Sequence, residues 1–262
     1  MTRMDQLGWC GALADAARVR DAGYDFLELP LAAFGLEDDA GLAAAKKAVA
    51  AAPLPLPVFS RFYPPDFRTV GEGVDRLRIQ SYLKRAADLM HHAGARIAVL
   101  GSAWSRNVPE GFSRTRAREQ ILEAYGWVAD ALAGSGIMAA IEAQNRKEAN
   151  IVTTLAEAVD YAQALNRPEA MRVIADFYHM DEENEPLSDL VRFGDWIAHV
   201  QLADSGRLNP GTGCYDYGAF FRALRACTYT GTVSVECMVP IPEQSMRDSQ
   251  IFLRQFWAGS RE

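Results

Sequence analysis

The stretch IAHVQLADSGRLNPGTGCYD, residues 197–216, contains the pattern that decides the fold. Its first half alternates polar and apolar side chains, so at the two-residue period of a β-strand His199 and Gln201 share one face. Arg207 and the PGTG turn follow where that strand must end. A strand with a polar inner face and a polar loop at its carboxyl end is typical of a barrel of parallel strands, which carries its chemistry at that end.

The rest of the chain repeats the same unit of a strand followed by a helix. Besides the stretch above, strands are predicted for a segment ending at Trp9 and for residues 25–30, 55–60, 95–102, 138–145, 171–179 and 232–238. Helical spacing of apolar residues predicts helices over residues 12–22, 39–52, 73–92, 113–133, 155–165, 190–196, 217–226 and 243–257. Eight strands that alternate with eight helices predict an α/β protein with one domain over residues 1–262, a (β/α)8 TIM barrel.

Two of these helices carry recognisable start signals. Thr154 and Glu157 have capping-box spacing, so the hydroxyl and the carboxylate should each accept a hydrogen bond from an amide at the start of the helix. Asp216 is placed to cap the helix over 217–226. No G-x-G-x-x-G turn follows an early strand, which argues against a dinucleotide-binding sheet.

Composition restricts the partners and the compartment. Hydrophobic residues make up 49% and charged residues 23% of 262, which suits an ordinary globular domain. A net charge of -7 argues against a nucleic-acid partner, because such affinity is built from clustered Lys and Arg. The four cysteines form no C-x-x-C pair, which favours a reducing, cytoplasmic setting. No apolar run long enough for a signal peptide core or a membrane span is present, so no membrane association is expected.

Four consecutive predicted strands end in a side chain that binds hard cations: Glu142, Asp176, Gln201 and Glu236. Each falls on the inward register of its strand. Three converging carboxylates repel one another, so a cation should lie among them. Oxygen donors suit Mg²⁺ or Mn²⁺ better than Zn²⁺. The alternatives are that any single carboxylate is a hydrogen-bonded core group, and that Gln201 is a hydrogen-bonding spacer.

The whole chain resembles the xylose isomerase-like TIM barrels of the sugar phosphate isomerase/epimerase superfamily. The four strand-end residues match the ligand positions of its ketose 3-epimerases and hydroxypyruvate isomerases. The resemblance also implies substrate contacts for Glu148, His179 and Arg207, which lie six, three and six residues after the first three ligands. The segments GSAWSRNVPEGFSR (101–114) and ADSGRLNPGTG (203–213) resemble family sequence as well. The second is closest to hydroxypyruvate isomerases, which share Gln as the third ligand, whereas most epimerases have His.

The resemblance implies a divalent-metal-dependent isomerase or epimerase that acts on a ketose or a small hydroxy-keto acid through an enediolate. Glu142 and Glu236 come from strands three apart around an eight-stranded ring, so they can flank the reacting carbon and act as the acid/base pair. Return of the proton to the same carbon is epimerisation, and return to the neighbouring carbon interconverts aldose and ketose. The sequence leaves both open.

Other polar and aromatic residues have weaker indications. Trp104 follows a strand end and is a candidate for lining a sugar site, although packing is the alternative. His199 lies one layer below Gln201 and is interpreted as a histidine behind the ligands or in the core. Glu28 either closes the pocket floor or forms a structural ion pair. For His179 and Arg207 the alternatives are orientation of the neighbourhood of Asp176 and a loop salt bridge.

Two rival functions remain open, and a third is disfavoured by the sequence. A dehydratase or lyase on a polyol or cyclic keto acid would use the same barrel and the same enediolate. A non-catalytic sugar-binding barrel would keep the fold alone. An endonuclease-IV-like enzyme would need a multi-zinc cluster rich in His, and the chain has only four histidines. The expected partner is thus a small sugar or keto acid, and the sequence is compatible with a homo-oligomer.

Overall fold

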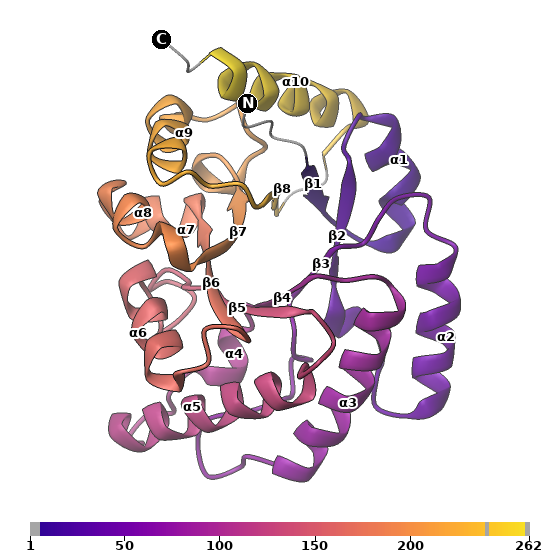
Figure 1. The fold of residues 1–262 in the computed structure, drawn as a ribbon, viewed down its shortest axis with the longest axis vertical. Helices are drawn as coiled ribbons and strands as arrows, with labels where there is room; N and C mark the ends of the chain where they lie inside the picture. The colour runs from indigo at the N-terminus through magenta and orange to yellow at the C-terminus, as the bar shows by residue number, and fades with distance from the viewer. Residues whose placement is uncertain (1–5, 239–240, 260–262) are drawn as a thin grey trace.

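The computed structural model describes residues 6–238 and 241–259, which form a closed barrel of eight parallel strands (Figure 1). Neighbours in sequence are neighbours in the barrel, and β1 also pairs with β8 in parallel, which closes the ring. The strands are β1 (Leu7–Cys10), β2 (Phe26–Pro30), β3 (Val58–Ser60), β4 (Ile97–Leu100), β5 (Met138–Ile141), β6 (Met171–Asp176), β7 (Ile197–Leu202) and β8 (Thr232–Val235). The predicted (β/α)8 TIM barrel is confirmed.

Helices surround the strands (Figure 1). They are α1 (Ala16–Asp21), α2 (Asp39–Ala50), α3 (Arg76–His92), α4 (Ala103–Arg106), α5 (Arg114–Ala131), α6 (Leu155–Leu165), α7 (Phe177–Glu182), α8 (Ser188–Arg192), α9 (Tyr217–Ala226) and α10 (Glu243–Gly259). Short 3-10 turns lie at Leu13–Asp15, Leu31–Phe34, Gly194–Trp196 and Ser205–Arg207. Eight of the helices match the predicted ones. The two short helices α4 and α7 follow directly after the ends of β4 and β6, where the sequence pattern predicted a loop and the rest of a strand.

Several strands end earlier than predicted. The strand predicted for 171–179 stops at Asp176, because its carboxylate oxygen Oδ1 accepts a hydrogen bond from His179 N at 3.1 Å and begins α7. The strand predicted for 138–145 stops at Ile141. Beyond it, Asn145 N donates to the ring of His179 at 3.1 Å instead of to a strand. The predictions for 55–60, 95–102 and 232–238 are likewise too long, since the structure has strands only at Val58–Ser60, Ile97–Leu100 and Thr232–Val235.

The barrel interior confirms the predicted inward register. A buried cluster separate from the main core joins side chains from strands β2 to β6: Phe26, Val58, Ile97, Val99, Ala140 and Ile174. Gly8 on β1 makes room for this cluster, because a Cβ atom there would lie 2.1 Å from the ring of Phe26. Ala140 and Ile174 are two residues before Glu142 and Asp176. These carboxylates therefore continue the inner face at the carboxyl end of the barrel.

The predicted helix starts are also confirmed. Thr154 Oγ1 accepts a hydrogen bond from Glu157 N at 3.2 Å, and Glu157 Oε2 accepts one from Thr153 N at 2.8 Å, one residue before the cap. Asp216 Oδ1 accepts from Ala219 N at 2.8 Å at the start of α9. Local sequence signals therefore set these helix boundaries as expected.

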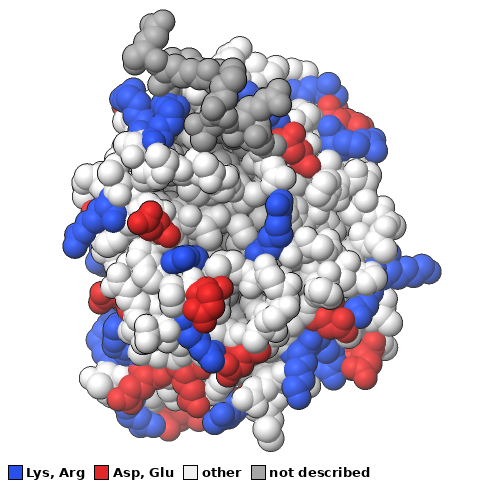
Figure 2. Space-filling view, in the orientation of Figure 1, with Lys and Arg blue, Asp and Glu red and all other residues white. Residues whose placement is uncertain are grey.

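The surface carries charges of both signs. On the face shown in Figure 2, lysine and arginine side chains are interspersed with aspartate and glutamate. All four cysteines are free thiols. Within residues 6–238 and 241–259, no helix is both long and apolar enough to cross a membrane.

One carboxyl group outside the barrel mouth is held in an unfavourable electrostatic position. Glu185 Oε2 accepts a hydrogen bond from Leu155 N at 2.8 Å, at the start of α6. Burial and the charges of Asp189 and Glu183 raise the pKa of Glu185 to about 7, against the effect of the Leu155 hydrogen bond. The folded protein therefore binds this proton more tightly than the unfolded chain does.

We expect Glu185→Gln to stabilise the protein at alkaline pH but not near pH 4.5. The wild type loses stability as pH rises from about 4.5 through 7, because ionisation is disfavoured only in the folded state. Glutamine keeps the acceptor and does not ionise, so the gain at pH 8.5 should be about 1 to 2 kcal/mol after allowance for partial solvent screening. Urea unfolding at pH 5 and pH 8.5 measures it. The exposed control Glu119→Gln should show no such pH dependence, and an equal gain for Glu185→Gln at both pH values would contradict the assignment.

Candidate metal and substrate site

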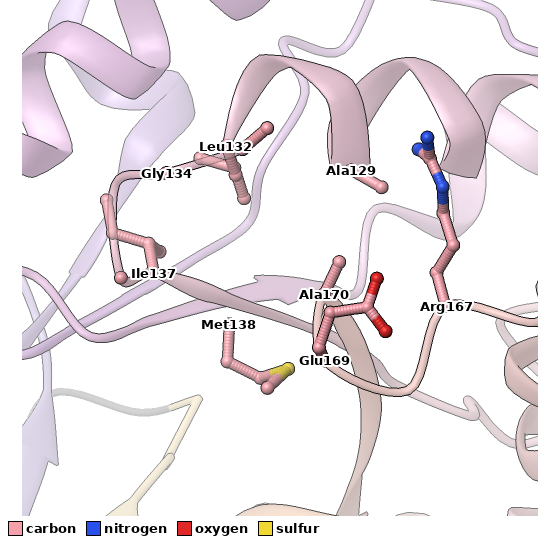
Figure 3. Close-up of a pocket in the computed structure, with 10 residues that line it drawn as sticks. Ala129, Leu132, Gly134, Ile137, Met138, Arg167, Glu169 and Ala170 are labelled. Carbon is pink, nitrogen blue, oxygen red and sulfur yellow. The ribbon is translucent and has the colours of Figure 1, made fainter.

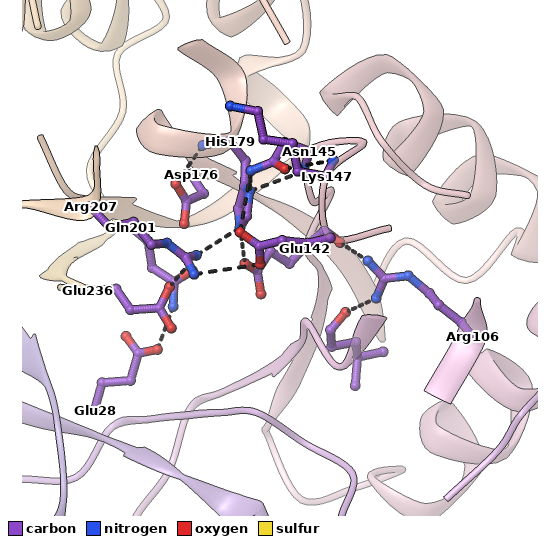
Figure 4. Close-up of polar contacts among 12 residues, drawn as sticks. Glu28, Arg106, Glu142, Asn145, Lys147, Asp176, His179, Gln201, Arg207 and Glu236 are labelled. Atoms are coloured by element: carbon purple, nitrogen blue, oxygen red, sulfur yellow. Dashed lines mark hydrogen bonds and ion pairs between the residues drawn. The ribbon is translucent and has the colours of Figure 1, made fainter. Parts of the chain in front are cut away.

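The four predicted ligands meet at the carboxyl end of the barrel. Glu142 follows β5, Asp176 ends β6, Gln201 lies on β7 and Glu236 follows β8. In the sheet register Asp176 is paired with Gln201, and Glu236 N donates to Leu202 O at 2.8 Å, which keeps Glu236 at the level of the β7 end. Figure 4 shows the four side chains directed toward a common space. The structure therefore brings together the donors that the sequence predicted.

Two of the predicted ligands lie with His179 at the spacing of a metal site. One ligand atom each from Glu142, Asp176 and His179 lie within 4.8 Å of one another, and all three residues are buried. The sequence interpretation had assigned His179 to the substrate, so its position among the carboxylates adds a possible nitrogen donor. This group could hold a metal ion.

The electrostatics of the site disfavour the ionised form of two of its carboxyl groups. Burial raises the pKa of Glu142, and the charge of Asp176 adds to the effect. Burial and the charge of Glu142 raise the pKa of Glu236 to about 8, although Arg207 opposes the shift. Both carboxyl groups are thus disfavoured as anions by desolvation and by each other. A divalent cation bound among them would offset both effects by stabilising the ionised carboxylates.

Gln201 shows that the donor set fits a metal. The side chain is fully buried, and its Nε2 donates to Glu28 Oε1 at 2.6 Å. This bond fixes the orientation of the amide, and the other amide atom, Oε1, is buried without a hydrogen-bond partner. An unpaired buried oxygen is costly unless a ligand satisfies it. Oxygen Oε1 of Gln201 is therefore suited to a hard cation.

Glu28 on β2 holds the floor of this site. It is fully buried and accepts hydrogen bonds from His199 Nε2 at 3.0 Å, from Ser234 Oγ and from Gln201. Burial alone would raise the pKa of Glu28, but the hydrogen bonds and charge of His199 outweigh it, and the pKa is lowered. The other ring nitrogen of His199 is 2.7 Å from Thr232 Oγ1, so both nitrogens are engaged away from any metal.

His179 is oriented by Asn145, a fully buried residue that the sequence interpretation did not single out. Burial opposes a charged ring, but Asp176 and Glu142 raise the pKa of His179 to about 9. The backbone N–H of Asn145 donates to Nδ1, however, so this geometry holds the neutral ring with its hydrogen on Nε2. That Nε2 lies 3.4 Å from Glu142 Oε1.

Arg207 reaches into the site from the turn after β7, in a left-handed backbone conformation with φ of 58°. Its Nη2 atom lies 3.4 Å from Glu236 Oε2, and its Nη1 atom lies 3.6 Å from Glu148 Oε2. The guanidinium also lies 4.7 Å from the centre of the Tyr178 ring. Nη2 is only 2.9 Å from His179 Nε2, which places two donors side by side. A substrate oxygen within hydrogen-bond distance of both nitrogens could accept from each.

Two residues that the sequence interpretation missed position Glu142. The guanidinium of Arg106, which is 3% exposed, donates to Glu142 O at 2.6 Å and to Leu100 O at 2.8 Å, as Figure 4 shows. A Cβ atom on Gly101 would lie 1.6 Å from Glu142 Oε2. Gly101 continues the inward register of Ile97 and Val99, and this signal could have identified it. Trp104 lies in α4, where its Nε1 donates to Pro64 O at 3.0 Å, and its substrate role stays a prediction.

Two cavities differ in their relation to this site. One of about 260 Å³ lies at the carboxyl ends of β1 and β8, where its lining includes Trp9, Cys10 and Cys237, the residue after Glu236. Another of about 390 Å³ lies between the end of α5 and the starts of β5 and β6 (Figure 3). The second is at the opposite end of the strands from the carboxylates. The first therefore lies at the same end of the barrel as the carboxylates.

A family comparison agrees with this geometry. The model of the family described as xylose isomerase-like TIM barrel matches residues 16–256. The chain belongs to this family. The superfamily resemblance in the sequence is thereby confirmed.

Relatives of this xylose isomerase-like barrel are epimerases. A ketose 3-epimerase from Arthrobacter globiformis is 30% identical over 94% of this chain and 84% of its own length. A 3-dehydro-D-guloside 4-epimerase from Escherichia coli K12 is 29% identical over 71% of this chain and 74% of its own. The solved 3-keto-D-glucoside 4-epimerase from E. coli superposes with a TM-score of 0.79 at 25% identity, covering 95% of this chain and 99% of that one. These relatives support an epimerase as the enzyme class of this chain.

Proposed function

We propose that this chain is a metal-dependent epimerase that inverts a carbon next to the ketone of a keto-sugar, through an enediolate. The observation that carries the proposal is the pair of glutamates at the ends of β5 and β8, where Glu142 is buried, Glu236 is partly buried, and the charge of Glu142 raises the pKa of Glu236. Removal of a proton from one face and its return to the other requires two such groups. A single carboxylate would return the proton to the face that it came from.

The proposed metal ligands are Glu142, Asp176, Gln201 and Glu236. The partnerless Gln201 Oε1 supports this set over one that uses His179, because Nε2 of His179 lies 2.9 Å from the Arg207 guanidinium. Oxygen ligands favour Mn²⁺ or Mg²⁺. When bound, such an ion would act as a Lewis acid that polarises the ketone and acidifies the adjacent C–H.

The remaining residues of the site would bind and orient the substrate. We assign hydrogen bonds to substrate oxygens to His179 and Arg207, and Glu148 would hold Arg207 in place through their 3.6 Å contact. The part of the sugar farther from the reacting carbon would occupy the cavity of about 260 Å³, whose rim carries the Asp15–Arg18 pair at 3.0 Å. Trp104 would line the opposite side of the sugar.

The named relatives support epimerisation over the rival reactions. One is named as a 3-epimerase of ketoses and the other as a 4-epimerase of a 3-dehydro sugar. Carbon 3 of a 2-ketose and carbon 4 of a 3-dehydro sugar share one chemical property, a position next to a ketone. That shared position is what we propose for the substrate of this chain.

The decisive experiment follows a carbon-bound proton in heavy water. Protein stripped with EDTA is supplied with Mn²⁺ or Mg²⁺ and a panel of free 2-ketoses and 3-keto glycosides, and proton NMR detects deuterium at each carbon. We expect metal-dependent exchange next to the ketone together with the epimer at that carbon.

The products separate the alternatives. An aldose product would indicate isomerisation, and loss of water would indicate a dehydratase. If no member of the panel exchanges and neither ion raises the melting temperature, the enzyme proposal is wrong.

A further inference from the structure

A small cavity behind the site is lined by residues with unpaired hydrogen-bond donors. It measures about 10 Å³, room for one small ligand, and lies between the end of β4, helix α5 and the segment after β3. Three buried polar atoms without a partner belong to its lining residues: Tyr63 Oη, Tyr125 Oη and Arg106 Nε. Each of the three residues is at least nine-tenths buried, with exposed fractions of 5%, 5% and 3%.

The other polar side chains of the lining are already satisfied. Thr69 Oγ1 donates to Ser105 O at 3.0 Å, and Ser105 Oγ donates to Ser102 O at 2.7 Å. Ser102 Oγ accepts from Tyr63 N at 2.9 Å. The side-chain donors of the lining that remain without a partner are therefore the two phenol hydroxyls and the Nε atom of the guanidinium.

Arg106 brings a positive charge to this cavity and has no counter-ion. It is the one charged residue of the lining, and its hydrogen bonds go to the carbonyls of Leu100 and Glu142. No carboxylate among the described residues lies within 4.0 Å of it. The charge of Glu157 reaches Tyr125, but its carboxylate accepts from Thr153 N at 2.8 Å. Buried charges in proteins are normally paired.

We propose that this cavity is a binding site for a monovalent halide, chloride in the cell, held by Arg106 Nε and the hydroxyl groups of Tyr63 and Tyr125. All three groups are unpaired hydrogen-bond donors of residues that line one cavity, and the anion would neutralise the guanidinium. Burial raises the pKa of both phenols, that of Tyr125 to about 12, so both keep their hydrogens at neutral pH. A water molecule would satisfy the hydrogen bonds but would leave the charge uncompensated.

The halide would act on the reaction through Arg106 as a positioning residue. The guanidinium joins the last carbonyl of β4 to the carbonyl of Glu142, and Figure 4 shows it on the outer side of that strand end. An anion bound to Nε would restrict the movement of the guanidinium. Halide binding should therefore stiffen the backbone that carries Glu142.

Bromide tests the site directly. Protein refolded and crystallised in sodium bromide should show an anomalous scattering peak in contact with Arg106 Nε and both phenol oxygens. Crystals of Tyr63→Phe/Tyr125→Phe protein should lack the peak. A water molecule at this place in wild-type crystals grown in bromide would overturn the proposal.

Melting temperatures at constant ionic strength give a second measurement that needs neither metal nor substrate. Replacing sodium gluconate by sodium chloride at about tenfold excess over Kd should raise the melting temperature of the wild type by about 3 °C or more. The double variant, or Tyr125→Phe if the double variant does not fold, should lose this dependence. The control Tyr229→Phe removes a buried phenol that bonds to Thr232 O at 2.7 Å, and it should keep the full halide effect. A wild type that melts at the same temperature in both salts also overturns the proposal.

Discussion

Glu142→Gln and Glu236→Gln should each lower solvent deuterium exchange by at least about 10³-fold. Each substitution removes a proposed proton-transfer group and weakens a proposed metal ligand, and general acid/base catalysis alone is worth about 10²- to 10⁴-fold. The fold should persist without metal. Both carboxyl groups have raised pKa values in the metal-free protein, so a neutral amide relieves repulsion there, and the melting temperature of the apoprotein should stay equal or rise.

The control for this pair is Glu119→Gln, which changes an exposed carboxylate on α5 and should leave exchange unchanged. Metal affinity is measured in parallel, so that exchange can be compared at saturating metal. Near-wild-type turnover in either active-site variant at saturating metal would remove that glutamate from the acid/base pair.

Gly101→Ala should lower kcat by about 10²-fold although it changes no chemical group of the site. The new methyl group would lie 1.6 Å from Glu142 Oε2 and 2.7 Å from Glu142 Cδ, so the carboxylate must move by more than an ångström. Displacement of that size from a reactive geometry costs about two orders of magnitude. Metal affinity should fall as well, because Glu142 is one of the proposed ligands. Steady-state kinetics and metal titration measure the two effects.

A matched glycine separates this steric effect from the general cost of substitution. Gly73 has no atom within 4 Å of the position of a new Cβ, so Gly73→Ala should be close to neutral in kcat and metal affinity. If Gly101→Ala retained wild-type kcat and metal affinity, the present position of the Glu142 carboxylate would not be required for catalysis or metal binding.

The strand ends could be predicted because barrel strands repeat with a period of two. Ala140 and Ile174 fix the inner face, and Glu142 and Asp176 continue it, so each carboxylate was found from its own strand. The exact ends were less predictable. Phe177 and Tyr178 favour strands by propensity, but the carboxylate of Asp176 caps a helix there, and this hydrogen bond to His179 N overrides the strand preference.

The supporting residues were harder to find because their roles depend on contacts across the barrel. Asn145 orients the ring of His179, which lies in α7 after β6. Arg106 donates a hydrogen bond to the backbone carbonyl of Glu142, which follows the neighbouring strand β5. Neither role produces a periodic pattern in the local sequence from which it could be predicted. Glu28 was placed at a strand end, but its bond to an amide 173 residues away could not be read from spacing.

That long separation has a consequence for the order in which the site is assembled. Glu28 bonds to Gln201 across 173 residues and to Ser234 across 206, so it is synthesised with β2 and obtains its partners only when the last two strands join the barrel. Closure of such long loops carries an entropic cost that no local contact repays. A nascent chain therefore cannot present an oriented set of oxygen donors before Glu236 has been made. With the proposed ligand set, metal loading would be confined to the completed barrel.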